Sequence, residues 1–322
     1  MRIHKEKRSG YDSRPSGGFR LTCMSEARRD ERMKFGVYLP NFGAFGSARM
    51  LADLAADAEA AGWDGFFLWD HIARPWVTEF VDPWVALSAV AMTTKRLRIG
   101  ALITPLPRRR PWKVARETVS LDHLSGGRLV VGVGIGGIGG RQVEWQAFGE
   151  EMDLRVRGEM LDEALEILAG LWSGRPFTYA GRHYRVEESH FLPIPLQSPR
   201  IPVWVAGWWP HLVPFRRAAR WDGIFPEFPA ANGNVLGQLN SAVAYVRERR
   251  AHDAPFDVVY ASTTTPGDDP RRAAEIVKPY AEAGVTWWLE RIDPLQFGGT
   301  WQAEWPIDTM RRRIRQGPPP HA

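Results

Sequence analysis

Short apolar runs alternate with helical segments eight times along this sequence. The expected strands cover residues 34–39, 63–69, 97–104, 129–134, 201–205, 223–225, 256–261 and 285–289. The first, third, fourth and fifth of these runs are continuously apolar, which is typical of parallel strands buried on both faces. Eight such repeats in about 290 residues match the usual size of a (β/α)8 TIM barrel, an α/β fold with a closed parallel sheet. We therefore predict a TIM barrel with loop insertions.

Residues with unusual chemistry lie where these strands end. The second strand ends at Trp69, Asp70 and His71, the third runs into Pro105, and the fourth runs into a glycine cluster. The carboxyl ends of the strands in a parallel barrel meet at one rim, where barrel enzymes hold their active sites. The pattern therefore predicts a functional site at this rim.

Asp70 and His71 are the candidate acid–base pair. Imidazole titrates near neutral pH and can move a proton to or from a substrate oxygen. Asp70 would orient the imidazole or cap the next turn. The alternative is a surface turn in which water solvates both side chains, and this is the commoner case for such a pair taken alone. His183 and His190 flank a short predicted hairpin and could serve a substrate, although a surface location is the commoner case there too.

A glycine cluster at residues 132–140 contains the pattern G-x-G-x-x-G. A dinucleotide-binding fold needs this pattern after its first strand, with a helix directly behind it. Here the pattern follows the fourth strand, and residues 141–153 read as irregular and polar, so we disfavour a Rossmann fold. Backbone without side chains would let a flat ring approach closely. A flexible loop without a ligand explains the glycines equally well.

Two further segments at the same rim could bind anions. Arg108, Arg109 and Arg110 follow the third strand and could hold a polyanionic tail, or they form a solvated run of charge. Gly207 and Trp208 join the fifth strand to a helix, whose N-terminal N–H groups would suit a phosphate. A simple Gly/Pro turn with packed tryptophans is the alternative for that segment.

The composition narrows the classes of function. The formal net charge is +5, and six of the 42 basic residues are lysines, so bidentate arginine contacts to carboxylates and phosphates are available. No nucleic-acid-binding module and no metal-binding motif is recognisable, so we predict neither nucleic acid nor a metal as a partner. Cys23 is the single cysteine, which rules out an internal disulfide and suits a cytoplasmic protein. No apolar run approaches the ~20 residues that cross a membrane.

Residues 1–32 differ in composition from the rest of the chain. They are rich in Arg, Ser, Gly and acidic residues, and they lack the apolar centre of a signal peptide. We predict a disordered leader over residues 1–32 and one barrel domain over residues 33–322.

Five motifs together resemble a known family. They are FGVYLPN at residues 35–41, WDH at 69–71, IGALITP at 99–105, LDHLSGGR at 121–128 and GVG at 132–134. From residue 33 to residue 320 the chain resembles the bacterial luciferase-like monooxygenase superfamily, and within it the branch that uses the deazaflavin coenzyme F-420. Each motif alone is weak, and their combination is specific.

The resemblance implies that the coenzyme lies across the barrel rim. The residues that it assigns to cofactor binding are Asn41, Ala101, Leu102, Thr104, Gly134, Ile135, Gly136, Gly207 and Trp208. A cis peptide bond between Ala101 and Leu102 would lie against the ring, and the turn at Gly207 would take the phosphate. Relatives commonly carry Gly-Asn or Gly-Gly where this chain has Gly207-Trp208.

The resemblance also implies an activity. His71 would act as general acid or base next to the reactive ring carbon, and Asp70 would hold its tautomer, while hydride moves between the reduced deazaflavin and a small organic substrate. Reduced FMN with O₂, in a monooxygenase, is the second interpretation, and a catalytically silent ligand-binding barrel is the third. Family members often pair, so we expect a homodimer.

Overall fold

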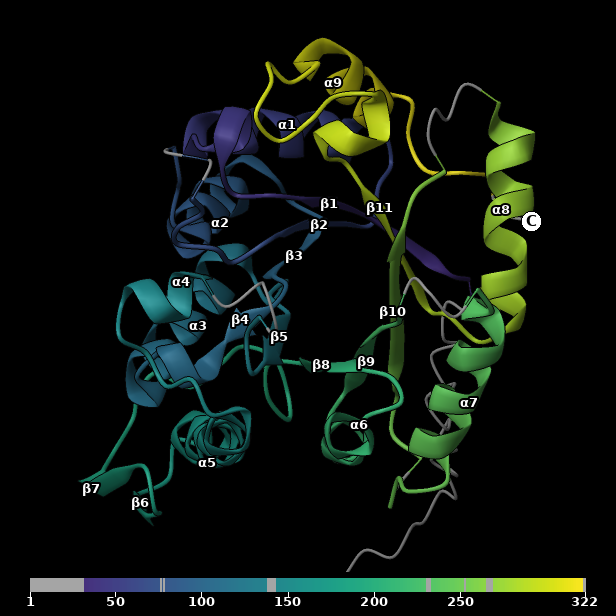
Figure 1. Ribbon diagram of the computed structural model, residues 1–322. Helices are drawn as coiled ribbons and strands as arrows, with labels where there is room; N and C mark the ends of the chain where they lie inside the picture. Colours follow the sequence, from purple (N-terminus) through teal and green to yellow (C-terminus); the bar gives the residue numbers. More distant parts are fainter. Residues whose placement is uncertain are drawn as a thin grey trace, which may run out of the picture. The chain divides into compact units, whose positions relative to one another are not determined.

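A closed ring of parallel strands forms the centre of the barrel domain. The computed structural model describes residues 32–75, 77, 79–137, 143–229, 233–251, 253–264 and 269–320. The strands of the main sheet are β1 (Lys34–Leu39), β2 (Gly65–Leu68), β3 (Arg98–Ala101), β4 (Thr104–Pro105), β5 (Val131–Gly134), β8 (Val203–Trp208), β9 (Gly223–Glu227), β10 (Asp257–Ser262) and β11 (Trp287–Arg291). Their order is β3-β2-β1-β11-β10-β9-β8-β5-β4 (Figure 1). A parallel bridge between Ile99 of β3 and Leu129, two residues before β5, closes the barrel.

Helices surround this sheet (Figure 1). They are α1 (Ala48–Ala60), α2 (Pro83–Thr93), α3 (Pro111–Ser125), α4 (Val143–Ala147), α5 (Leu154–Trp172), α6 (Leu212–Ala218), α7 (Val235–Arg247), α8 (Pro270–Glu282) and α9 (Ile307–Arg315). Local sequence sets their ends. The carboxylates of Asp82 and Asp153 accept backbone hydrogen bonds at the starts of α2 and α5, and Gly126 ends α3 in a left-handed conformation, as is usual for such caps. The predicted (β/α)8 barrel is confirmed.

An apolar layer fills the barrel interior. It consists of Phe67, Leu102, Val130, Trp204, Phe225, Val259, Trp287 and Leu289. Tyr38, Ile103, Ala206 and Ala261 pack on this layer and are only partly buried. All four lie toward the carboxyl ends of their strands, so they form an apolar floor at the rim where the sequence predicts the site.

The third barrel strand is interrupted, which the sequence does not predict. β3 pairs with β2 up to Ala101, and pairing resumes at Thr104, which faces β5. The change of partner falls on the two residues between these strands. A cis peptide bond joins Leu102 and Ile103, one residue beyond the predicted position between Ala101 and Leu102.

The connection between β5 and α5 contains a helix where irregular chain is predicted. Helix α4 spans five residues within the predicted irregular segment 141–153. Glu144 and Trp145 are buried on this helix. Because so short a helix is not stable by itself, these tertiary contacts stabilise it.

The hairpin predicted around residues 180–182 is present as β6 (Phe177–Ala180) and β7 (Arg185–Ser189), which pair antiparallel. The predicted leader, apart from Arg32, lies outside the described residues. Within the described part of the chain, no helix is both long and apolar enough to cross a bilayer. In that same part, no group of three or more His, Cys, Asp and Glu side chains is arranged to hold a metal ion.

Candidate functional site

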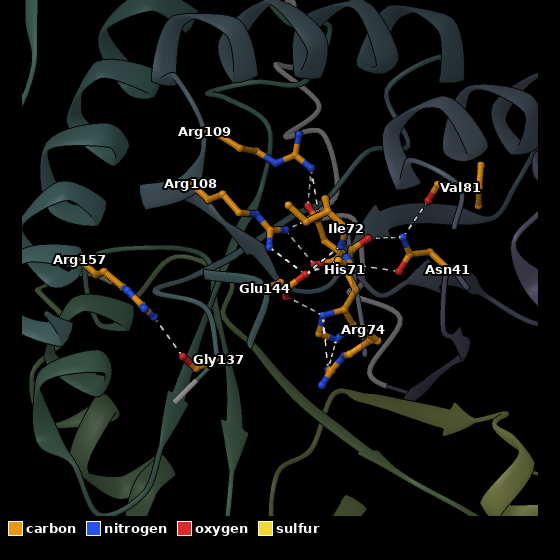
Figure 2. A network of polar contacts seen from close by, with 12 residues as sticks. Asn41, His71, Ile72, Arg74, Val81, Arg108, Arg109, Gly137, Glu144 and Arg157 are labelled. Atoms are coloured by element: carbon orange, nitrogen blue, oxygen red, sulfur yellow. Dashed lines mark hydrogen bonds and ion pairs between the residues drawn. The ribbon is translucent and has the colours of Figure 1, made fainter. Parts of the chain in front are cut away.

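The backbone of His71 is held in place at the carboxyl end of β2. The amide nitrogen of Asn41, which follows β1, donates to the carbonyl oxygens of His71 and Val81, each at 2.8 Å. The Asn41 side-chain oxygen accepts a hydrogen bond from the His71 N–H at 3.1 Å. Asn41, which the resemblance assigns to the cofactor, therefore uses its amide to position His71 (Figure 2).

The His71 ring lies against an aromatic wall. The centroids of Trp69 and Phe42 are each 5.9 Å from it, in edge-to-face geometry. Tyr38 lies 5.8 Å from Trp69. Such edge-to-face contacts are favourable and directional, so they fix the ring and connect it to the apolar floor.

Glu144 of α4 is the carboxylate that contacts the His71 ring (Figure 2). Its Oε1 lies 2.9 Å from His71 Nδ1, and its Oε2 accepts a hydrogen bond from the Ile72 N–H at 2.9 Å. Arg108 Nη1 lies 3.1 Å from the same Oε2. The Glu144 side chain is 5% exposed, so bulk water screens these interactions little.

Arg74 contacts the other nitrogen of the imidazole. Its Nη2 lies 2.8 Å from His71 Nε2 and 3.4 Å from Nδ1, so the guanidinium approaches over the face of the ring (Figure 2). The Glu144 carboxylate has acceptors only, so the ring proton on Nδ1 donates to it. The positive charge of Arg74 beside Nε2 disfavours a second proton there, so the imidazole is neutral in this arrangement.

Burial and charge set the ionisation of this pair. Burial lowers the pKa of the His71 imidazole; the hydrogen bond with Glu144 opposes this shift, and the charge of Arg74 adds to it. Burial favours the neutral acid of Glu144, but the hydrogen bond with His71, the charge that His71 gains on protonation and the charge of Arg108 lower its pKa to about 2. A neutral imidazole beside an ionised carboxylate can accept a proton at its outer nitrogen, because the carboxylate stabilises the imidazolium that forms.

The Asp70 carboxylate binds arginines and not the His71 ring. Arg109 Nη2 lies 3.0 and 2.9 Å from its two oxygens, and Arg108 Nη2 lies 3.2 Å from Oδ1. Successive side chains of an extended chain point to opposite sides, so Asp70 and His71 at a strand end face different neighbours. Among the described residues Glu144 therefore holds the ring, which corrects the predicted role of Asp70.

The three arginines after the third strand do not behave as one solvated or ligand-binding run. The side chains of Arg108 and Arg109 are 4% and 17% exposed, and both bind the Asp70 carboxylate. Arg110 precedes α3 and is the exposed member of the run. The first two arginines therefore stabilise the rim.

The predicted cofactor-binding residues of the third strand lie in different environments. Ala101 is buried in the core that faces the helices, whereas Leu102 packs inside the barrel. The Leu102 carbonyl accepts a hydrogen bond from the Tyr38 hydroxyl at 2.7 Å. Thr104 is fully buried, and its hydroxyl has no hydrogen-bond partner among the described residues. Thr104 is thus the one of the three whose side chain has a polar atom to offer to a ligand.

The glycines at the end of β5 make room for neighbouring side chains. A Cβ atom at Gly134 would lie 2.8 Å from Ile103 Cγ2, and one at Gly136 would overlap the Trp145 ring. Gly136 also has a φ of +85°, and Ile135 between the two glycines is half-buried. Close packing is therefore a third explanation for these glycines, besides the approach of a flat ring and the flexibility of a loop.

Gly207 and Trp208 lie within β8, which extends beyond its predicted end at residue 205. A Cβ atom at Gly207 would collide with Pro214 of α6, so the glycine lets this helix pack closely on the strand. Helix α6 begins at Leu212 and has seven residues. Packing against α6 accounts for Gly207 without a phosphate.

Arg157 of α5 holds the connection that carries Glu144. Its side chain is fully buried, and its guanidinium lies 3.6 Å from the centroid of the Trp145 ring. It donates to the carbonyl oxygen of Gly137 at 3.0 Å (Figure 2) and to that of Glu151 at 2.5 Å. Arg157 therefore ties both ends of this connection to α5.

Arg74, Glu144 and Arg157 are outside the site that the sequence predicts. The first two lie in connections between strands and helices, where no periodic pattern indicates the direction of a side chain. Arg157 gives a signal, because it lies four residues before Leu161, on the same face of α5 as the apolar stripe. An arginine on the buried face of a helix needs buried partners.

The barrel and the acid–base cluster at its rim define a class of protein. The sequence profile of the luciferase-like monooxygenase family matches residues 33–308. The chain therefore belongs to this family, as its motifs indicate.

The chain is similar in sequence to an F420-dependent dehydrogenase and similar in fold to other solved structures. The F420-dependent glucose-6-phosphate dehydrogenase of Gordonia bronchialis is 32% identical over 250 residues, which cover 74% of this chain and 70% of the dehydrogenase. Monooxygenase RslO1 from Streptomyces bottropensis has a TM-score of 0.67 at 21% identity, with 88% of this chain and 97% of that chain covered. An F420-dependent secondary alcohol dehydrogenase, solved in complex with an F420-acetone adduct, has a TM-score of 0.66 at 18% identity, with 81% and 93% covered.

Proposed function

We propose that this protein is an oxidoreductase that transfers hydride between the deazaflavin coenzyme F420 and a small organic substrate. The observation that carries the proposal is the neutral His71 ring at the barrel rim, whose Nδ1 lies 2.9 Å from the buried Glu144 carboxylate. Hydride transfer at a carbon that bears a hydroxyl or carbonyl oxygen needs a group that takes or gives the proton of that oxygen. The F420-dependent relative at 32% identity supports the choice of coenzyme.

The residues of the rim fit a flat coenzyme. Tyr38, Ile103, Ala206 and Ala261 offer an apolar floor. The buried Thr104 hydroxyl, which lacks a partner among the described residues, can bond to a polar atom of a ligand, because buried polar groups are rarely left unpaired. When bound, a deazaflavin supplies a ring carbon that accepts or releases hydride. We propose that this floor and Thr104 hold it.

The other polar residues of the rim support His71. In this proposal His71 holds or moves one proton at Nε2, and Glu144 keeps the second ring proton on Nδ1. Arg108 contacts both Glu144 and Asp70, at 3.1 and 3.2 Å, so Asp70 positions the cluster through Arg108 and Arg109 and does not itself exchange a proton.

Fluorescence titrations with F420 and with FMN test the proposal. We expect F420 to bind at least about tenfold more tightly than FMN. Thr104→Val, which removes the hydroxyl and keeps the shape, should weaken F420 binding about fivefold, the free energy of one hydrogen bond. A preference for FMN would instead favour a flavin-dependent monooxygenase, and binding of neither compound would favour a catalytically silent barrel.

We also propose that the protein pairs with a second copy through α2. The sequence of this helix, PWVALSAVAMT, is apolar on almost every side, and such a helix is usually buried all round. Yet Val85 and Met92 are 62% and 72% exposed. Light scattering after size-exclusion chromatography should give the mass of a dimer, and the double substitution Val85→Glu and Met92→Glu should give a monomer. A wild-type monomer at micromolar concentration would contradict this proposal.

A further inference from the structure

The nitrogen of His71 that the proposed proton transfer uses is in contact with a second cation. Arg74 Nη2 lies 2.8 Å from His71 Nε2, while the carboxylate of Glu144 lies on the Nδ1 side of the ring. Nη2 also lies 3.4 Å from Nδ1, so the guanidinium approaches over the ring face and leaves the Nε2 lone pair open. A substrate atom that exchanges a proton with Nε2 then lies beside this guanidinium and can form a hydrogen bond with each of the two groups.

We propose that Arg74 is a second catalytic residue, which binds the oxygen of an alcohol or carbonyl substrate. This inference rests on the proposed function and adds a residue to the same site. The substrate oxygen accepts a hydrogen bond from Arg74 and donates its own proton to His71 Nε2. Two hydrogen bonds of about 2.8 Å that meet at a tetrahedral oxygen place their nitrogens about 4.5 Å apart, so the long Arg74 side chain moves back by roughly 2 Å.

The step balances without a further reactant. As the alcohol C–H bond breaks, its hydride leaves for the oxidised deazaflavin. The O–H proton goes to His71 Nε2, and the electrons of the O–H bond form the C=O bond. The products are the carbonyl compound, the reduced coenzyme and an imidazolium, and reduction of a carbonyl is the same step in reverse.

The donor chemistry of arginine selects oxygen over nitrogen at this position. Partial negative charge develops on the oxygen while its proton moves ahead of the hydride, and a guanidinium stabilises that charge. Oxidation of an amine gives an iminium cation, which a guanidinium at hydrogen-bond distance repels. Arg74 therefore favours alcohols and carbonyl compounds over amines of the same shape.

The first experiment compares turnover of the enzyme loaded with oxidised F420 on propan-2-ol, cyclohexanol and cyclohexylamine. We expect oxidation of the alcohols and not of the amine. Arg74→Gln should lower kcat on alcohols by about 10²-fold, as for the loss of one charge-stabilising donor, with a much smaller change in KM. Arg74→Lys should restore part of the loss, and the exposed arginine of the hairpin, changed in Arg185→Gln, should leave kcat unaltered.

The outcomes distinguish a failure of this inference from a failure of the proposed function on which it rests. If F420 does not bind, the proposed function fails and this inference fails with it. If F420 binds but the enzyme oxidises only the amine, or none of the three compounds, the assignment of alcohols is wrong. If Arg74→Gln retains the wild-type kcat on alcohols, Arg74 is not catalytic.

A second measurement needs no substrate. Four charged groups act on the His71 ring: Glu144 from α4, Asp70 and Arg74 from the chain beside it, and Arg108 through its contact with Glu144. NMR titration of the His71 ring signal, assigned with His71→Ala, should show a higher pKa in Arg74→Gln and a lower pKa in Glu144→Gln. An unchanged pKa in Arg74→Gln would show that the guanidinium does not lie at Nε2 in solution, and would overturn the inference.

Discussion

Two histidine–glutamate pairs of nearly equal length lie in different settings. His71 Nδ1 is 2.9 Å from Glu144 Oε1 at the barrel rim, and His183 Nε2 is 3.0 Å from Glu159 Oε2 beside the hairpin of β6 and β7. The two imidazoles are similarly covered, with 22% and 15% of the side chain exposed. Their carboxylates differ, because Glu144 is 5% exposed and Glu159 is 30% exposed.

The difference continues in the other partners of each carboxylate. Glu144 receives a backbone N–H and lies against the buried guanidinium of Arg108, whereas Glu159 binds Arg155 and Arg182, whose side chains are exposed. Charges interact more strongly where water is excluded, and exposed ion pairs contribute little. Contact distance alone therefore does not distinguish the two pairs, whereas the burial of the carboxylate does.

Replacing each histidine in turn tests this contrast most strongly. His71→Ala should lower turnover about 10²–10⁴-fold, the usual effect of losing an acid–base group, while the Kd for F420 changes little. Steady-state kinetics and fluorescence titration measure the two quantities. His183→Ala is the matched control and should leave both unaltered. Equal losses in the two variants would remove the distinction between the pairs.

The next largest loss of activity is expected from replacing the glutamate of the rim pair. Glu144→Gln should lower kcat about 10²-fold, because an amide does not stabilise an imidazolium. Glu144 raises the pKa of His71, so its loss lowers that pKa. If His71 acts as the base, the acid limb of the kcat/KM profile then moves to lower pH. Glu159→Gln should retain the wild-type profile, and a shifted limb in that variant would mean that the hairpin communicates with the site.

The barrel could be predicted from the sequence because its signals are local. Each strand is a short apolar run, and helices such as α2 and α3 carry their own start and stop residues, Asp82 and Gly126. The interruption of the third strand between Ala101 and Thr104 could not be predicted in this way. It arises where the chain changes its pairing partner from β2 to β5, which is a property of the folded sheet.

The site could be predicted only in part. His71 stands out because it follows a buried strand, but Glu144 is 73 residues further along the chain, on a helix that tertiary contacts stabilise. From the sequence we assign the orienting role to Asp70, although the alternation of side chains along an extended chain points Asp70 and His71 to opposite sides. The sequence offers no equivalent indication for Arg74, since its direction depends on the conformation of its loop.

The smallest effect that we predict concerns stability in acid. The pKa of Glu144 is about 2 in the folded protein, below its ordinary value of 4.5. A carboxyl with a depressed pKa stabilises the folded state above pH 4.5 and loses this effect as the pH falls toward 2. Because one pKa unit corresponds to about 1.4 kcal/mol, we expect about 2 kcal/mol of this stabilisation to be lost between pH 7 and pH 3. Urea unfolding between pH 7 and pH 3 should show a flatter acid dependence for Glu144→Gln than for the wild type. The hydrogen bond with His183 and the charges of Arg182 and Arg155 also lower the pKa of Glu159, but water screens these exposed contacts, so Glu159→Gln should flatten the curve less. Equal flattening in both variants would show that water reaches Glu144 as easily as it reaches Glu159.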